Sequence, residues 1–163
     1  MNPTETSTHA ELAKPAKQPF LPPRWVVRVA WSIHRAGHAL TGGRRGLWLP
    51  RPGKWGALRL TTIGRRTGKE RHVILGYYED GPNLVTLAMN GWADAEPAWW
   101  LNLQARPETT VRLKNGTRAV RARMAEGDER ARLWQRWYEF GDDIDGYAWR
   151  RPHGTAVVVL EPR

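Results

Sequence analysis

The sequence contains no cysteine, which excludes disulfide bonds, thiolate metal sites and cysteine nucleophiles. Long apolar runs are also absent. The longest, such as residues 156–160, span about five residues, whereas a membrane-spanning helix needs about 20. The first residues lack the basic and then apolar layout of a secretory signal. These absences predict a cytoplasmic protein.

Familiar metal and nucleophile patterns are missing as well. His34 and His38 stand four residues apart, as metal ligands on a helix can, but no third ligand or adjacent glutamate completes a zinc-enzyme pattern. The sequence offers no Ser-His-Asp arrangement. We therefore predict no metal site. A chain without an evident nucleophile is best suited to let a bound cofactor carry the chemistry.

Acidic residues are too few to balance the basic ones. The chain has 26 Lys and Arg against 16 Asp and Glu, a net charge of +10. This excess favours anionic partners, among them phosphates, acidic cofactors, nucleic acid and anionic lipid surfaces. The 10 tryptophans exceed the needs of an ordinary core and indicate flat surfaces for a ring or an interface.

Composition and periodicity divide the chain into an arm and one domain. Residues 1–23 are polar and contain proline, which predicts a disordered N-terminal arm. The domain, residues 24–163, begins with a predicted basic amphipathic helix over 24–41. This helix either packs on the domain or lies, through residues 24–40, on a membrane surface.

The rest of the domain is mainly β with flanking helices. Asp80-Gly81 and Asn115-Gly116 are strong hairpin signals. Consecutive hairpins favour antiparallel pairing, and about six strands predict a small barrel. Strands are expected over 57–62, 72–79, 83–89, 109–113, 118–124 and 155–161, and helices over 97–106 and 127–140.

A basic turn, residues 64–71, separates the first two predicted strands. Its glycines let backbone N–H groups approach an anion, while its arginines supply forked donors and Thr67 a hydroxyl. The spacing matches neither the phosphate loop of nucleotide hydrolases nor a dinucleotide-binding fingerprint. The turn is therefore either an anion site or a solvated basic bend.

Residues 87–103, "LAMNGWADAEPAWWLNL", form a second cluster of interest. Gly91 allows close approach, Asn90 offers an amide, and the nearby Trp92, Trp99 and Trp100 offer flat rings. Such a junction can cradle a planar ligand. The alternative is that at least two of the three tryptophans belong to the core.

Three stretches carry a family resemblance: "LTTIGRRTGKER", "LVTLAMNGW" and "EPAWWLNLQARPETTVRL". In this order they resemble the deazaflavin-dependent nitroreductase and quinone reductase family, over about residues 58–124. The resemblance implies a split β-barrel of about six mostly antiparallel strands. It also implies binding of coenzyme F-420, an 8-hydroxy-5-deazaflavin with a phosphate and an oligoglutamate tail. FMN is the alternative cofactor, since the wider superfamily binds both.

The resemblance also implies roles for individual residues. In the family the basic turn grips the cofactor phosphate, which here assigns Arg65, Arg66, Thr67, Gly68 and Arg71. The deazaflavin ring lies against the following strand, the next strand end and the start of the helix. The corresponding residues here are Ile74, Leu75, Gly76, Ala88, Met89, Asn90, Gly91, Ala98 and Trp99. Many relatives have a serine where this chain has Met89.

The expected function is that of a deazaflavin-dependent oxidoreductase, acting as a monomer or homodimer. It would pass a hydride from reduced coenzyme F-420 to a small-molecule acceptor: a quinone, a nitroaromatic or an activated alkene. Tyr147 or solvent would donate the proton. The alternatives are a non-catalytic carrier of deazaflavin or FMN, and a basic nucleic-acid-binding barrel. The second is disfavoured because the tryptophans fall mostly on predicted helices rather than along a strand face.

Overall fold

The computed structural model describes residues 46–141, 144–149 and 151–163, without the side chains of Trp92 and Tyr147. The predicted arm, the predicted helix 24–41 and the two histidines at 34 and 38 lie outside these residues.

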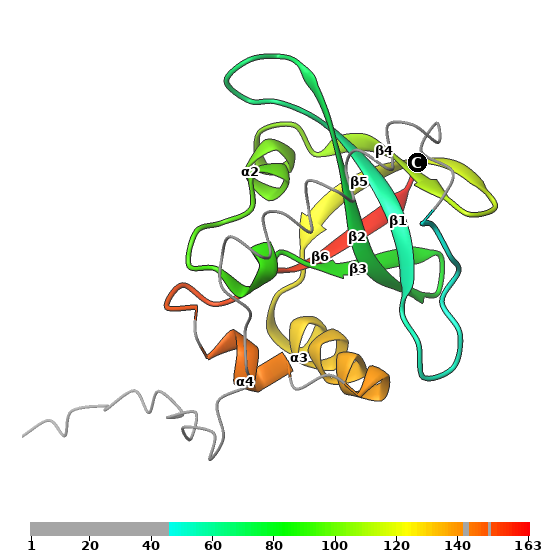
Figure 1. Cartoon of the computed structure of the whole chain (residues 1–163), viewed down its shortest axis with the longest axis vertical. Helices are drawn as coiled ribbons and strands as arrows, with labels where there is room; N and C mark the ends of the chain where they lie inside the picture. Colours follow the sequence, from blue (N-terminus) through cyan, green and yellow to red (C-terminus); the bar gives the residue numbers. More distant parts are fainter. Residues whose placement is uncertain (1–45, 142–143, 150) are drawn as a thin grey trace, which may run out of the picture.

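Six antiparallel strands close into a barrel in the order β1-β2-β3-β6-β5-β4, with β4 returning to β1 (Figure 1). The strands are β1 Gly56–Ile63, β2 Glu70–Asp80, β3 Asn83–Leu87, β4 Glu108–Leu113, β5 Gly116–Met124 and β6 Val157–Pro162. All six predicted strands are confirmed. The third ends at Leu87 instead of Met89, because Met89 already has a helical backbone conformation (φ −94°, ψ −16°).

Helices flank the barrel on one end and one side. They are η1 Asn90–Trp92, α2 Ala98–Ala105, α3 Gly127–Arg136, η2 Trp137–Phe140 and α4 Ile144–Ala148. The predicted helix 127–140 is divided into α3 and the 3-10 turn η2, which ends at the left-handed Gly141 (φ 77°). The short α4 was not predicted. Within the described residues, no helix combines the length and the apolar character needed to cross a bilayer.

The interior core follows the alternation of side chains along the strands. On β1, Leu58 and Leu60 point inward and are fully buried, whereas the alternating residues Arg59 and Thr61 are only half-buried. Helix α2 contributes Trp99 and Trp100 to this core. The core interpretation of two of the three clustered tryptophans is therefore confirmed.

A second core lies outside the barrel, between β3, β6 and the helices α3, η2 and α4. Tyr78 on β2 is buried there against Trp137, and its hydroxyl donates to the Leu133 carbonyl at 2.7 Å. Because β6 packs against both cores, Val157 to Leu160 are buried on both faces. This explains the continuous apolar run near the end of the sequence.

Ion pairs fasten α3 to the end of β2. Asp80 accepts a bidentate pair from Arg132, at 2.9 and 2.8 Å, and a third bond from Arg136 at 2.9 Å. The Arg132 guanidinium, which hydrogen-bonds to Asp80, holds the pKa of that carboxyl below its ordinary value of 3.8. A carboxyl with a lowered pKa in the folded state stabilises the fold above its unfolded pKa.

We expect Asp80→Asn to lower the unfolding free energy by about 1 kcal/mol at neutral pH, because these pairs are partly exposed to solvent. The Asp80 contribution is lost as pH falls below 3.8 through the lowered folded pKa. The variant should therefore lose less stability than the wild type between neutral and strongly acid pH. Urea unfolding across that range measures how the unfolding free energy of the wild type and of the variant changes with pH. The same pH dependence in both proteins would contradict the role assigned to Asp80.

Candidate functional site

The basic turn joins β1 to β2 and is held in a compact shape by its own backbone. The Gly64 N–H donates to the Lys69 carbonyl at 2.8 Å, and the Gly68 N–H donates to the Gly64 carbonyl at 2.7 Å. A Cβ on Gly64 would stand 2.7 Å from the Thr67 hydroxyl oxygen, and Gly68 has a φ of 65°. Both glycines are therefore required by the conformation of the turn.

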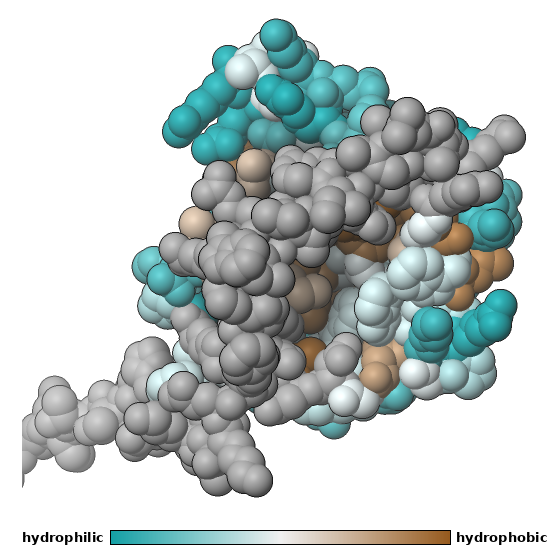
Figure 2. Space-filling view, in the orientation of Figure 1, coloured by the Kyte–Doolittle hydropathy of each residue, from teal (hydrophilic) through white to brown (hydrophobic). Residues whose placement is uncertain are grey.

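Four cations lie on this turn, and the carboxylate next to them in sequence, Glu70, contacts His72 at 3.1 Å instead. Arg65, Arg66, Lys69 and Arg71 are exposed, and none forms an ion pair within the described part of the chain. The turn projects as a hydrophilic ridge at the top of the space-filling view, with apolar surface below it (Figure 2). Unneutralised cations gathered on one compact turn favour an anionic ligand.

Asn102 of α2 fixes the position of the turn. It is buried at 6% exposure, its side-chain oxygen accepts from the Arg65 N–H at 3.0 Å, and its amide donates to the Thr62 hydroxyl at 3.2 Å. Arg71 is the partner of Thr62 in the β1–β2 register, so it lies on the α2 side of the sheet. Sequence reasoning missed Asn102, although a single amide inside the apolar stretch 98–103 was a usable signal.

The barrel is opened between β2 and β3. Only Tyr78–Asp80 pair with Asn83–Val85, and the next contact is a side-chain bond from the Thr86 hydroxyl to the Gly76 carbonyl at 2.8 Å. We call the gap between residues 70–76 of β2 and residues 86–91 the split. In an antiparallel strand the backbone groups of alternate residues point to the same edge, so Ile74 presents its N–H and C=O to the split, as Gly76 does.

Side chains around the split come from both faces of β2. Leu75 packs against the interior core, whereas Ile74 and Gly76 are on the outer face. A Cβ on Gly76 would stand 3.3 Å from the Trp55 ring, so the indole lies directly on the glycine backbone. Trp55 in turn contacts Trp48, with ring centroids 5.3 Å apart. Sequence reasoning missed Trp55, because nothing local linked it to the second strand.

The segment opposite β2 has an unusual backbone. Ala88 is buried in the interior core and Met89 packs on the outer core. The next two residues are left-handed, Asn90 at φ 46° and Gly91 at φ 61°. The Asn90 side-chain amide donates to the Ala95 carbonyl at 2.9 Å and closes the loop.

The start of α2 adjoins this loop. There, Ala98 lies on the surface, and Trp99 is 8% exposed with its ring in the interior core.

Arg151 holds this loop from the side of β6. Its side chain is fully buried and donates to the carbonyls of Met89 and Ala93, both at 2.7 Å, and to Glu96 Oε1 at 2.9 Å. Sequence reasoning missed Arg151, and no local signal separates it from the other 25 basic residues.

Helix α4, which contains Tyr147, is fastened through Asp145. This carboxylate accepts from Trp134 Nε1 at 2.8 Å and from the Tyr138 hydroxyl. The Arg151 N–H then donates to the Ala148 carbonyl at 2.9 Å. The backbone of Tyr147 is thus held between α3 and the loop beside the split.

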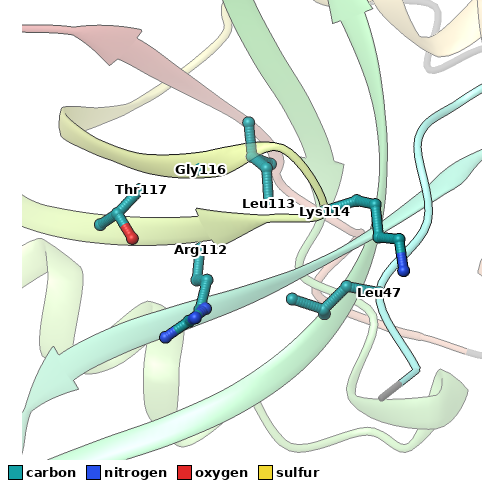
Figure 3. Close-up of a pocket in the computed structure, with 6 residues that line it drawn as sticks. All are labelled: Leu47, Arg112, Leu113, Lys114, Gly116 and Thr117. Carbon is teal, nitrogen blue, oxygen red and sulfur yellow. The ribbon is translucent and has the colours of Figure 1, made fainter. Parts of the chain in front are cut away.

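A cavity of about 320 Å³ lies at the other end of the barrel, by the β4–β5 hairpin (Figure 3). It shares no residue with the predicted site, and the side chains of Arg112 and Lys114 diverge on either side of Leu47 instead of converging. This geometry does not support a binding site. The lining residues are Leu47, Arg112, Leu113, Lys114, Gly116 and Thr117.

Comparison with known proteins gives consistent results. The sequence model of the F-420H(2)-dependent quinone reductase family matches residues 32–162. A protein of Mycobacterium tuberculosis, named as a candidate F-420H(2)-dependent quinone reductase, is 34% identical over 106 residues, which are 65% of this chain and 89% of that protein.

Solved structures show the same fold. A structure described as an F-420-H2 dependent reductase (FDR-A) is 26% identical, with a TM-score of 0.59, over 71% of this chain and 100% of that one. A structure described as a domain-swapped dimer is also 26% identical, with a TM-score of 0.60, over 82% of this chain and 99% of its own. The expected split β-barrel is therefore confirmed.

We expect Asn102→Leu to lower the unfolding free energy by about 1–3 kcal/mol, because it leaves the Arg65 N–H and the Thr62 hydroxyl without their partner. Hydrogen exchange should then become faster at the Arg65 amide, while the amides of β6 keep their relative protection. The matched control is the double variant Thr62→Val/Asn102→Leu, which removes one of the orphaned groups and should recover part of the stability. Unchanged exchange at Arg65 would show that Asn102 does not hold the turn.

Proposed function

This chain belongs to the F-420H(2)-dependent quinone reductase family and is therefore an oxidoreductase that uses coenzyme F-420; we propose that the cofactor phosphate binds at the basic turn and its ring in the split. The supporting observation is the adjacency of the two features. The unpaired cations stand where β1 passes into β2, and the free edge of β2 begins at the same place and runs to Gly76.

The phosphate fits the basic turn. Arg65 and Arg66 would pair with it, the Thr67 hydroxyl would add a neutral donor, and Gly68 would let the backbone approach closely. Arg71, on the α2 side, would close the site from the strand. Because Asn102 fixes the Arg65 backbone, the backbone of the turn that carries these donors is ordered before the ligand arrives, which lowers the entropic cost of binding.

The ring fits the split. Backbone groups of Ile74 and the N–H of Gly76 would bond its polar edge, since the Gly76 carbonyl already accepts from the Thr86 hydroxyl. Leu75 and Trp55 would cover its apolar part. The opposite wall would be the segment 88–91, with Ala98 and Trp99 at the end nearest α2. When bound, coenzyme F-420 supplies the hydride. The protein residues orient the ring and exclude water from one side of it.

A quinone is the acceptor that family membership supports. We extend the proposal to nitroaromatics and activated alkenes, which are likewise electron-poor and can take up a hydride. We further propose that residues 24–163 form one domain, that two copies associate, and that residues 24–40 bring the enzyme to lipid-dissolved quinones. The similarity to a domain-swapped dimer supports only association.

Tyr147 is the proposed proton donor. The chain has four tyrosines, and burial excludes Tyr77 and Tyr78, which are 0% and 1% exposed. The Tyr138 hydroxyl is bonded to Asp145. Tyr147 remains, and its helix is fastened beside the loop that borders the split.

We expect the double variant Arg65→Ala/Arg66→Ala to bind oxidised coenzyme F-420 at least ten-fold more weakly, because each charge-assisted bond contributes about 1.5–3 kcal/mol and solvent screens part of that. Quenching of tryptophan fluorescence measures the affinity, and added salt should weaken wild-type binding. The charge-matched control is Arg112→Ala/Lys114→Ala, at the other end of the barrel. Equal losses of affinity in the two double variants would show that the effect comes from net charge and not from the basic turn. If the wild type does not bind the cofactor, the proposal is overturned.

We expect Tyr147→Phe to lower kcat for quinone reduction by about 10²-fold, the lower end of the effect of a general acid, with cofactor affinity unchanged. The measurement is oxidation of the reduced cofactor, followed by absorbance, with a quinone, a nitroaromatic and an activated alkene in turn. An unchanged kcat would assign the proton to solvent. Turnover of the quinone alone would restrict the substrate range to quinones.

A further inference from the structure

Arg151 makes a set of contacts that the proposed function does not use. Besides the two carbonyls and Glu96, its Nε donates to the Gly154 carbonyl at 3.1 Å. A buried cation costs several kcal/mol unless it is paired and hydrogen-bonded. Here the Glu96 carboxylate pairs the charge, and the carbonyls of Met89, Ala93 and Gly154 each accept one further N–H of the guanidinium. The loop 89–96 therefore wraps around one guanidinium.

The direction of these contacts orients a neighbouring peptide. The Ala88 N–H donates to the Ala156 carbonyl at 3.0 Å, so the side of this segment that faces Arg151 is the β6 side. The opposite side faces the free edge of β2, which is the split. The Met89 carbonyl points to Arg151, and the described residues contain no cis peptide bond. In a trans peptide the C=O and the next N–H point in opposite directions, so the Asn90 N–H points to the split.

The Asn90 N–H is available for a ligand. Asn90 is the first residue of η1, so its N–H has no acceptor within that helix. It also donates to no other acceptor within the described part of the chain. Its left-handed φ of 46° is uncommon for a residue with a side chain, although Asn adopts it more readily than most. Two hydrogen bonds hold the backbone here: one from Arg151 to the Met89 carbonyl, and one from the Asn90 side chain to the Ala95 carbonyl.

We propose that Arg151 is the positioning residue of the ring site. It turns the Met89–Asn90 peptide so that the Asn90 N–H donates to a carbonyl oxygen on the polar edge of the bound ring. The guanidinium on the carbonyl side also polarises this peptide and makes its N–H a stronger donor. This inference rests on the proposed function, since it requires the ring to occupy the split.

Ligand truncation separates this role from that of the basic turn. The two probes are coenzyme F-420 and its fragment of deazaflavin ring and ribityl chain without phosphate. We expect Arg151→Met to weaken both probes by the same factor, at least ten-fold. Arg65→Ala should weaken only the complete cofactor. Arg151→Lys keeps the charge but reaches fewer carbonyls, and should give an intermediate loss for both probes.

The control is Arg123→Met. Arg123 lies on β5, away from the split, and also forms several hydrogen bonds: two to Glu129 at 2.6 and 2.8 Å, and one to Glu161 at 2.7 Å. Its loss should lower thermal stability without changing the affinity of either probe. Equal affinity losses in the Arg123 and Arg151 variants, at temperatures where both are folded, would reduce Arg151 to a structural role and overturn the proposal.

A direct readout comes from the Asn90 amide. In the wild type its proton resonance should move downfield when the ring fragment is added, and in Arg151→Lys this shift should shrink. If Arg151→Met does not fold, the lysine variant carries the comparison. Should the wild type bind no coenzyme F-420, the proposed function fails. Should Arg65→Ala behave as expected while the Arg151 variants bind both probes normally, only this inference fails.

Discussion

The interruption of the β2–β3 ladder is the constraint on which the site depends. Three residue pairs join these strands, and beyond them the Thr86 hydroxyl occupies the Gly76 carbonyl where a backbone donor would otherwise continue the sheet. A continued ladder would use the backbone groups of Ile74 and Gly76 within the barrel. The interruption leaves a rigid strand edge, supported on its other side by the eight-pair register with β1. A rigid edge with available donors and acceptors is a suitable wall for a flat polar ligand.

Two buried polar side chains convert loops into fixed walls around this edge. Asn102 connects α2 to the basic turn, and Arg151 connects the entrance of β6 to the loop 89–96. Each is nearly inaccessible to solvent, at 6% and 3% exposure, and each bonds to backbone groups. Buried polar groups of this kind are costly unless satisfied, so they select one loop conformation over others. In the proposed site, these fixed loops would hold the ring and the phosphate of the cofactor in a fixed relation.

The division of the apolar residues between two cores explains the tryptophan content in part. Trp99 and Trp100 close the end of the barrel, and Trp137 packs α3 and η2 on its outer face. Trp48 and Trp55 form a separate pair beside Gly76. Tryptophan rings therefore pack in both cores and beside the split. Each ring covers a large apolar area and has few rotatable bonds.

The six strands, their hairpins and the basic turn could be predicted from the amino-acid sequence, because alternation, Asp-Gly and Asn-Gly turns and clustered arginines are local patterns. The sequence also carried the family motifs, and with them the fold and the cofactor. Three features became visible only in the folded chain: the place where the barrel opens, the contact of Trp55 with Gly76, and the bonds by which Asn102 and Arg151 hold the loops. These contacts join residues 21, 37 and 62 positions apart for Trp55–Gly76, Arg65–Asn102 and Met89–Arg151. Such pairings depend on how the sheet closes, and no local pattern in the chain encodes that.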